Sequence, residues 1–508
     1  MTAIRQRYER LEAARQPFLD RARDAAKLTI PSLLPPDGHS AHSKLYTPFQ
    51  GIGARGVNNL SSKMLLALLP PNSPFFRLTV DDFKLQELAQ EEGARAEVEE
   101  ALSKIERAVM SEIEASSTRI AAFEAIKHLL VAGNVLLYQP DKGGMRVFHL
   151  DRYVLKRDPM GNPLEIITKE DVSPSALPEE IRELLETSDE DTSQDEPVAL
   201  FTHVVRRDGK WNVTQEVAGI NVPEATGTFP LDKSPWIPLR LSRIDGESYG
   251  RGYVEEYQGD LNSLESLTQS IVEAAAASAK VLFLVRPNGT TRARVLAEAP
   301  NGAIREGDAN DVSTLQVNKS GDMQIAFQSS QEIKERLSFA FLMNSSVQRK
   351  AERVTAEEIR YMASELEDAL GGIYSILSQE FQLPLVNRLL LQMQKQKKVP
   401  QLPKGLVSPT IVTGLEALGR GHDLNKLAAM LEHLAPLGPE AIQKYMNIGD
   451  YITRVGTSLG MDMDGLIKSE EEMQQEEQQA MMMQTGQQLA PQAFDAMKEQ
   501  MQAPQGNE

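Results

Sequence analysis

The sequence predicts an α+β protein that is predominantly helical, and three features carry this prediction. Helical patterns fill most of the chain up to Ala132 and return after Tyr253. Between Val135 and about Arg243, short β-like runs are separated by turn residues. A second, smaller β-rich run lies between two helical segments in the second half of the chain. The chain therefore combines long helices with two separate β regions.

Four helical segments are expected before the first strand. Residues 1–30 form the first, which ends at Ile30 because the following proline disfavours helical geometry in the residue before it. Residues 57–69 form an apolar helix that two prolines stop. Residues 82–116 are a long charged helical region, and residues 119–132 are a more apolar one.

The first β region contains the clearest strand patterns, which cover residues 135–138, 147–150, 164–168, 198–205 and 211–214. One insertion interrupts them. Residues 179–196 hold nine acidic side chains against Arg182 alone, a composition typical of a solvated loop.

A β module between two helices is expected in the second half. Apolar residues keep a three-four spacing from Val254 to Ile271, and small alanines follow, which suits a helix packed closely on its neighbours. Strand-like sequence then extends from residues 281–285 to residues 323–327, and the helical pattern resumes at Ile333 and continues to about Met343. The β module thus lies at the end of a two-helix stalk.

The remaining chain is expected to be mainly helical. Residues 355–358 form a capping box, and an apolar face continues from Ile359 to about residue 391. A short strand near Ile411 precedes two or three helices that end around Lys468. The Gln- and Met-rich tail from Ser469 is compatible with a surface helix, a helix in a larger assembly, or disorder.

Composition excludes several classes of protein. The chain has 508 residues, enough for about three domains. Its net charge of −18 is the opposite of what binding nucleic acid over the whole surface requires, and without cysteine it has no disulfides, thiolate catalysis or Cys-ligated metals. The N-terminus has no signal-peptide pattern, and the longest apolar stretch, residues 271–285, is too short and too interrupted to span a bilayer.

One stretch, Gly51-Ile-Gly-Ala-Arg-Gly56, matches GxGxxG and raises the alternative of a dinucleotide-binding enzyme. That fingerprint needs a buried strand before it and a βαβ unit around it. Here Pro48 interrupts the would-be strand and no βαβ unit follows. The favoured interpretation is that these glycines allow close packing.

Other chemical motifs are weak. No P-loop is present, and His39 and His42, the only close histidine pair, lack an adjacent carboxylate pattern for a metal site. Residues 189–195 imitate the start of a calcium loop but lack its later glycine and glutamate, so a solvated acidic loop is favoured. We therefore expect no catalytic residues, no metal and no cofactor. The basic residues Arg349, Lys350 and Arg353 leave two readings open, solvated charges or contacts to an anionic partner.

Several stretches together resemble the head-to-tail connector, or portal, proteins of short-tailed double-stranded-DNA bacteriophages. They are residues 26–33, 53–60 with 67–70, 245–252 and 351–359, and their order and separation also fit. The resemblance covers about residues 1–465. These motifs concern packing and capping, so their combination carries the specificity.

The resemblance implies a ring, typically of twelve subunits, at one capsid vertex, through which DNA passes inward during packaging and outward during ejection. The implied domains are a split wing (residues 1–253 and 347–405), a two-helix stem (254–280 and 328–346), a β-rich clip (281–327), a helical crown (406–468) and the tail (469–508). Gln348, Arg349, Lys350 and Arg353 fall where the family has its channel-narrowing loop. The clip, with Arg286, Arg292, Arg294 and Arg305, is expected to dock the packaging motor and later the tail proteins.

The implied partners are other copies of the chain, double-stranded DNA, the terminase large subunit, major capsid and scaffolding proteins, and tail adaptor proteins, with no membrane. The implied location is the head-tail junction of the virion, after assembly in the host cytoplasm. Two alternatives remain at this point. One is the nucleotide-binding enzyme built on Gly51 to Gly56. The other is a non-portal scaffold or internal virion protein, suggested by the acidic tail.

Overall fold

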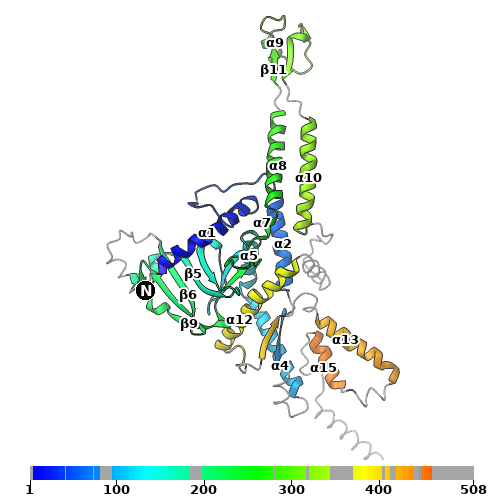
Figure 1. Ribbon diagram of the computed structural model, residues 1–508. Helices are drawn as coiled ribbons and strands as arrows, with labels where there is room; N and C mark the ends of the chain where they lie inside the picture. Colours follow the sequence, from blue (N-terminus) through cyan, green and yellow to red (C-terminus); the bar gives the residue numbers. More distant parts are fainter. Residues whose placement is uncertain are drawn as a thin grey trace, which may run out of the picture. The chain divides into compact units, whose positions relative to one another are not determined.

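The computed structural model describes residues 4–40, 42–71, 74–80, 94–177, 179, 181–182, 197–278, 282–315, 320–343, 370–402, 407–411, 419–438, 446 and 448–459. The chain divides into two compact units, residues 1–88 with 104–415 and residues 89–103 with 416–508. The first unit contains both helices and antiparallel sheets (Figure 1), so the predicted α+β class is confirmed as a mixed helix and sheet fold.

Six antiparallel strands form the largest sheet of the first unit. Their order is β4-β5-β6-β7-β8, and β9 pairs with β7. The bounds are β4 Tyr153–Arg157, β5 Pro163–Val172, β6 Val198–Arg207, β7 Lys210–Val217, β8 Ile220–Asn221 and β9 Gly227–Pro230. The β6–β7 hairpin turns at Asp208 and Gly209, whose φ angles are both positive. An Asp-Gly pair is favoured in such a two-residue turn because its backbone twist matches that of the strands.

Helix α1 (Ile4–Leu28) packs its first turns on this sheet. Ile4 and Tyr8 form a buried cluster with Val154, Ile167 and Phe201 from three strands. The free N–H groups at the start of the helix find their acceptor on the sheet. Those of Ile4 and Arg5 donate to the buried Glu216 carboxylate at 2.7 and 3.2 Å. A carboxylate at a helix N-terminus also interacts favourably with the helix dipole. The predicted N-terminal helix is confirmed, with its end two residues earlier.

A second carboxylate ties α1 to the sheet. Arg7 donates to both oxygens of Glu165 on β5, and His203 on β6 lies 2.9 Å from the same carboxylate. Burial alone raises the pKa of Glu165, but the hydrogen bonds from His203 and Arg7 outweigh it and lower that pKa to about 2. Glu165 therefore stays charged at neutral pH.

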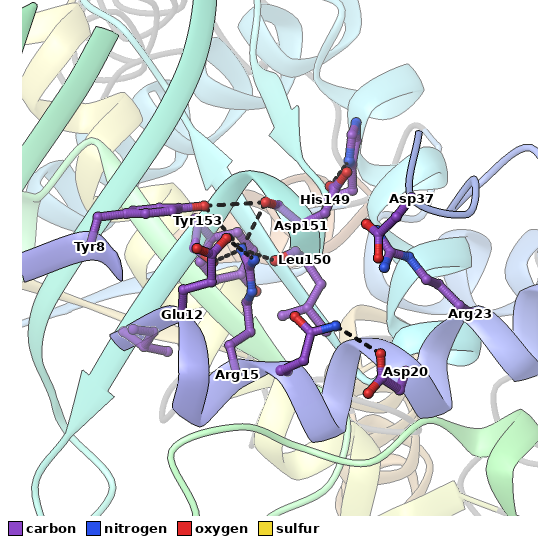
Figure 2. A network of polar contacts seen from close by, with 12 residues as sticks. Tyr8, Glu12, Arg15, Asp20, Arg23, Asp37, His149, Leu150, Asp151 and Tyr153 are labelled. Atoms are coloured by element: carbon purple, nitrogen blue, oxygen red, sulfur yellow. Dashed lines mark hydrogen bonds and ion pairs between the residues drawn. The ribbon is translucent and has the colours of Figure 1, made fainter. Parts of the chain in front are cut away.

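A polar network holds the middle of α1 against the short 3-10 turn Leu150–Arg152 before β4 (Figure 2). One nitrogen of the buried Arg15 guanidinium donates to the carbonyls of Leu150, Asp151 and Tyr153 at 2.7–3.1 Å and to the Tyr8 hydroxyl at 3.1 Å. These bonds satisfy backbone carbonyl groups of the turn and of the first residue of β4. The network is structural, since it joins α1 to this turn and to the start of β4.

Helix α5 (Thr118–Ala132) packs against α1 and leads into a second sheet. That sheet has the order β10-β2-β3, with β2 Asn134–Tyr138, β3 Arg146–Phe148 and β10 Trp236–Arg240. His128 on α5 stacks on His149 with ring centroids 5.7 Å apart. Burial, followed by the nearby His149, lowers the pKa of His128 to about 4, so this ring is neutral at pH 7.

Helix α12 (Leu383–Lys395) anchors the second sheet. It follows a π-helical turn, Ser378–Gln382, and its buried Arg388 donates to the Gln139 carbonyl at 3.1 Å and to Asp141 at 2.7 Å. Glu380 of the π turn is the carboxylate that two buried arginines share, Arg157 of β4 and Arg240 of β10. This arrangement joins the two sheets and the helix through side chains far apart in sequence.

A two-stranded sheet, β1 (Phe76–Val80) with β13 (Val407–Ile411), confirms the predicted strand near Ile411. The Leu78 N–H donates to the buried Glu106 of α4 (Ala94–Ala115) at 2.7 Å. Residues 82–93, the first part of the predicted 82–116 helical region, lie outside the described residues.

Two long helices, α8 (Gln258–Ser278) after the short α7 (Tyr253–Glu256) and α10 (Ser320–Ala340), pack side by side and are called the arm here (Figure 1). Between them in the chain lies the tip module, residues 282–315, with β11 (Leu282–Val285) paired to β12 (Val312–Leu315) and the short α9 (Ala293–Ala297).

The predicted strand over residues 323–327 is wrong. These residues are helical, because α10 begins at Ser320. Met323, Ile325 and Phe327 alternate with other residues as in a half-buried strand, but Ile325 and Phe327 are exposed on the helix surface. A short alternating run cannot by itself distinguish a strand from a helix that carries apolar residues on its outer face.

In the second unit, α13 (Gly419–Leu434) packs with α15 (Ile448–Leu459), and the Tyr451 hydroxyl donates to the Leu427 carbonyl at 3.4 Å. The predicted helices up to about Lys468 are thus described in part, and the tail from Ser469 lies outside the described residues. No described helix is long and apolar enough to cross a bilayer.

Candidate functional site

The base of the arm is bonded to the loop that follows α1. Glu265 of α8 is buried and accepts three hydrogen bonds from this loop, from the Tyr46 hydroxyl at 2.6 Å and from the N–H groups of Phe49 and Gln50 at 2.9 and 3.2 Å. The Gln50 side chain accepts from the Gly53 N–H and donates to the Leu28 carbonyl. The loop, the end of α1 and the start of α2 are therefore held in one place on α8.

The GxGxxG glycines serve close packing at this base. Helix α2 (Ile52–Leu68) follows a loop, and every strand pair in the described part of the chain is antiparallel, so a βαβ unit is absent there. A Cβ at Gly53 would lie 2.5 Å from the Leu28 carbonyl oxygen, and one at Gly56 would lie 2.5 Å from the Phe341 ring. The packing interpretation is confirmed for these two positions, whereas Gly51 has open space around it.

Helix α2 also holds the end of α10. Asn59 donates to the carbonyls of Phe341 and Leu342 at 2.9 and 3.0 Å, and Lys63 donates to the Leu342 carbonyl at 2.9 Å. Leu342 has a φ of 51°, a left-handed conformation that costs a non-glycine residue about 1–2 kcal/mol. The three hydrogen bonds offset this cost and fix the point at which the chain leaves the arm.

The basic residues that the sequence singles out follow shortly after this point. Gln348, Arg349, Lys350 and Arg353 all lie outside the described residues, as does the predicted capping box at residues 355–358. The described chain ends at Met343 and resumes at Leu370. Their role in the channel stays a prediction.

The tip module is organised by a carboxylate. Asp311 and Thr291 are its only buried residues among those whose burial is described. Asp311 accepts from the N–H groups of Thr290 and Thr291 at 2.7 and 3.2 Å and from the Thr290 hydroxyl, and its carbonyl accepts from the Arg286 N–H. The backbone bond from Thr291 and the bonds from Thr290 lower the pKa of Asp311. Among the residues whose burial is described, polar bonds rather than apolar contacts thus organise this module.

The four predicted docking arginines are exposed and come from three different segments of the tip module. Arg292 and Arg294 lie together at α9, where Arg294 pairs with Glu298, whereas Arg286 follows β11 and Arg305 lies in the loop before β12. Residues 282–315 carry these four arginines and four acids, Glu298, Glu306, Asp308 and Asp311. The module is therefore neutral overall, which an inspection of the arginines alone does not reveal.

The feature that the sequence analysis missed is exposed apolar surface on the arm and tip module. Nine of the twenty large hydrophobic residues that are exposed in the described part of the chain lie between Val272 and Phe339. On β11, the adjacent residues Phe283 and Leu284 are 66% and 52% exposed. Since successive strand residues point to opposite faces, both faces of this two-stranded sheet present apolar side chains to solvent. The signal in the sequence is the high apolar content of these segments, and the described chain adds no third strand to the β11–β12 sheet.

Comparisons of the sequence with known proteins identify one family. The family model described as bacteriophage head to tail connecting protein matches residues 1–467. The portal protein of Escherichia phage T7 is 46% identical over 471 residues, covering 91% of this chain and 88% of that protein. The portal proteins of Enterobacteria phages T3 and SP6 are 45% and 32% identical, each covering 91% of this chain and 88% and 89% of their own length.

Among solved structures, the neck of a native GTA particle computed with C12 symmetry has a TM-score of 0.36 and 12% identity, covering 81% of this chain and 90% of that one. This likeness is too weak to bear on the fold, and the sequence matches decide the family. The chain belongs to the bacteriophage head to tail connecting proteins, the portal proteins of short-tailed phages.

Proposed function

We propose that this chain forms a closed ring of identical subunits, twelve in number, at one capsid vertex, and that the ring conducts double-stranded DNA into the head during packaging and out of it during ejection. The role is structural and requires no catalysis. Family membership supports the location at the head-tail junction of the virion, with assembly in the host cytoplasm.

The exposed apolar residues on both faces of β11 carry the proposal. An isolated two-stranded sheet is marginal in water, and covering Phe283 and Leu284 would contribute about 1.5–3 kcal/mol each. A two-fold dimer would cover one patch with itself. Covering two different faces requires two neighbouring subunits. A repeated head-to-tail contact closes into a ring when the rotation between successive subunits adds up to a full turn.

The charge of the chain suits a channel in which DNA slides. A duplex carries about one negative charge per 1.7 Å of its axis, so a basic wall along the whole channel would hold it in place. Helices α7 and α8 contain five acids and no lysine or arginine, and Glu256 and Glu273 are the exposed ones among them. A mostly repulsive wall with one ring of contacts, from Gln348, Arg349, Lys350 and Arg353, would let DNA pass while still guiding it.

In this proposal the arm is the stem and the tip module is the clip, which docks the terminase large subunit during packaging and the tail adaptor proteins afterwards. The sheets with α1, α2, α5 and α12 form the wing, and α13 and α15 belong to the crown. Major capsid and scaffolding proteins would contact the outside of the ring.

Imaging of the purified protein tests the ring. Negative-stain micrographs should show rings with a central hole. Native mass measurement should give one defined whole-number multiple of the 56.3 kDa chain mass. A monomer, or open polymers of variable length, would contradict the proposal and favour a scaffold or internal virion protein.

Replacing Arg349, Lys350 and Arg353 together by Ala should leave folding and ring formation unchanged, because polar surface changes cost little. DNA packaging or retention should change, and more so at low ionic strength, where phosphate contacts are less screened. The measurement is packaged genome length at two salt concentrations. Arg206, Arg207 and Lys210, all exposed on the β6–β7 hairpin, provide a matched control with the same loss of charge. Equal genome length in all variants would leave the three residues as ordinary solvated charges.

Replacing Arg292 and Arg294 by Glu should leave rings intact and weaken motor binding about tenfold at low salt, because charge reversal sets like charges against an acidic partner surface. The lost Arg294–Glu298 pair is exposed and contributes little to stability. A pull-down with the motor protein measures the effect, and Arg206→Glu with Arg207→Glu controls for net charge. Unchanged affinity would show that these two arginines are not part of the docking surface.

A further inference from the structure

We infer that the ring contact at the arm joins two unlike faces of the chain, an acidic and apolar face of α10 on one copy and a basic and aromatic face beside α8 on the next. This inference rests on the proposed ring and assigns the residues that would make it. The partner is a second copy of this chain.

The first face, the α10 face, consists of Ile325, Glu332, Glu335 and Phe339, all of them exposed. Ile325, Glu332 and Phe339 are seven residues apart, so they lie within about 40° of one another around the helix. Phe339 is 76% exposed, although Leu337, two residues earlier and about 160° away around the helix, is fully buried. A phenylalanine directed away from the buried side of its helix has nothing to pack on within the described part of the chain.

The second face, the α8 face, consists of Lys27, Lys44, Tyr46, Phe49 and Val272. Tyr46 and Phe49 are exposed even though Glu265 holds their loop in place, and the Lys27 ammonium lies 5.0 Å from the Tyr46 ring. Lys44 is exposed in the same loop. Val272 is exposed seven residues after Glu265, on the same side of α8 and about 11 Å further along the arm.

The two faces lie on opposite sides of the arm. On α8, Asp260 pairs with Arg336 of α10 at 2.8 Å, whereas Glu265, about 140° away around the helix, binds the loop. In Figure 1 the loop after α1 meets α8 on the side away from α10. The Asp260–Arg336 pair also shows how the two helices align lengthwise. Ile325 on α10 and Val272 on α8 each lie about 17–18 Å along the arm from this pair. Both faces therefore span the same part of the arm.

The charges indicate that each face contacts the other face on the next copy of the chain. A two-fold contact would set Glu332 and Glu335 against their own copies, or Lys27 and Lys44 against theirs, and like charges in an interface are unfavourable. Setting the α10 face against the α8 face pairs glutamates with lysines and covers apolar side chains from both. Such a heterologous contact repeats around a ring and leaves each subunit with two neighbours.

Cysteine cross-linking tests the assignment, because the chain has no cysteine of its own. One pair is Ile325→Cys with Val272→Cys, and the other is Phe339→Cys with Phe49→Cys. Within one subunit each pair lies on opposite sides of the arm, beyond disulfide reach. In mildly oxidised rings, at least one double variant should give a ladder of covalent multimers. Each single variant should give none, and a mixture of the two single variants should give dimers only.

Charge reversal gives an independent measurement. Lys27→Glu with Lys44→Glu, or Glu332→Lys with Glu335→Lys, should each lower ring yield at low salt about tenfold, and the four changes together should recover it. Cross-linking of a single-cysteine variant with itself would overturn the inference by indicating a two-fold contact. Wild-type rings with no ladder from either pair and no effect of charge reversal would overturn it while leaving the ring proposal in place. Absence of rings in the wild type would overturn both.

Discussion

Replacing Glu380 by Gln is expected to destabilise the first unit by about 3–5 kcal/mol, because it removes the counter-charge that two buried arginines share. The Arg240 Nε donates to Glu380 Oε1 at 2.9 Å, and an Arg157 nitrogen lies 3.7 Å from Oε2. Burial lowers the pKa of Arg157 to about 10, and the charge of Glu380 opposes this shift. Without it, Arg157 and Arg240 keep their carbonyl acceptors but lose the one carboxylate with which they form ion pairs in the described part of the chain.

Urea unfolding followed by circular dichroism measures this change. Glu298→Gln is the matched control, since Glu298 also pairs with an arginine but is exposed, and such pairs contribute about 0–1 kcal/mol. If both variants unfold at the wild-type urea concentration, the buried pair does not hold the two sheets and the π turn together.

Replacing Phe341 by Ala is expected to cost about 3–5 kcal/mol. Its ring is fully buried and covers Gly56 of α2. The ring centroid lies 5.9 Å from the ring centroids of Tyr253 and Tyr257. The sharper expectation concerns Gly56→Ala. In the wild type the new methyl group would overlap the Phe341 ring and destabilise the protein, whereas in the Phe341→Ala background it would stabilise it, because alanine is the better helix former by about 1 kcal/mol.

A double-mutant cycle in urea measures this reversal of sign. Gly51→Ala serves as the control within the same motif, because open space surrounds Gly51. Its effect should be near zero, since a weaker helix cap and a less flexible unfolded chain offset each other. Additive effects at Gly56 and Phe341 would show that the third glycine of the motif is not needed for packing.

Local features of the fold follow from the sequence where neighbouring residues dominate the energy. Proline after Ile30 and after Leu69 limits two helices because it disfavours helical geometry in the residue before it. The Asp208-Gly209 turn and the alternating residues of β6 and β7 define a hairpin for the same local reason. The two-helix arm was also predictable, from the three-four spacing of its apolar residues.

The candidate site was predictable only in part. Exposure of Arg286, Arg292, Arg294 and Arg305 follows from their charge, and the four acids that neutralise the module are equally visible in the sequence. The helical start of α10 was missed because an exposed apolar face on a helix imitates the alternation of a strand.

By itself, the sequence determined the family, the ends of α1 and α2 before prolines, the hairpin and the absence of cysteine chemistry. Only the tertiary structure decided that Gly56 faces Phe341 across 285 positions, that Glu380 balances Arg157 and Arg240, and that Phe339 faces solvent. The physical reason is that turns and helix ends depend on the backbone energetics of adjacent residues. Burial and charge pairing depend instead on which distant segments come into contact, and no local sequence pattern predicts those contacts.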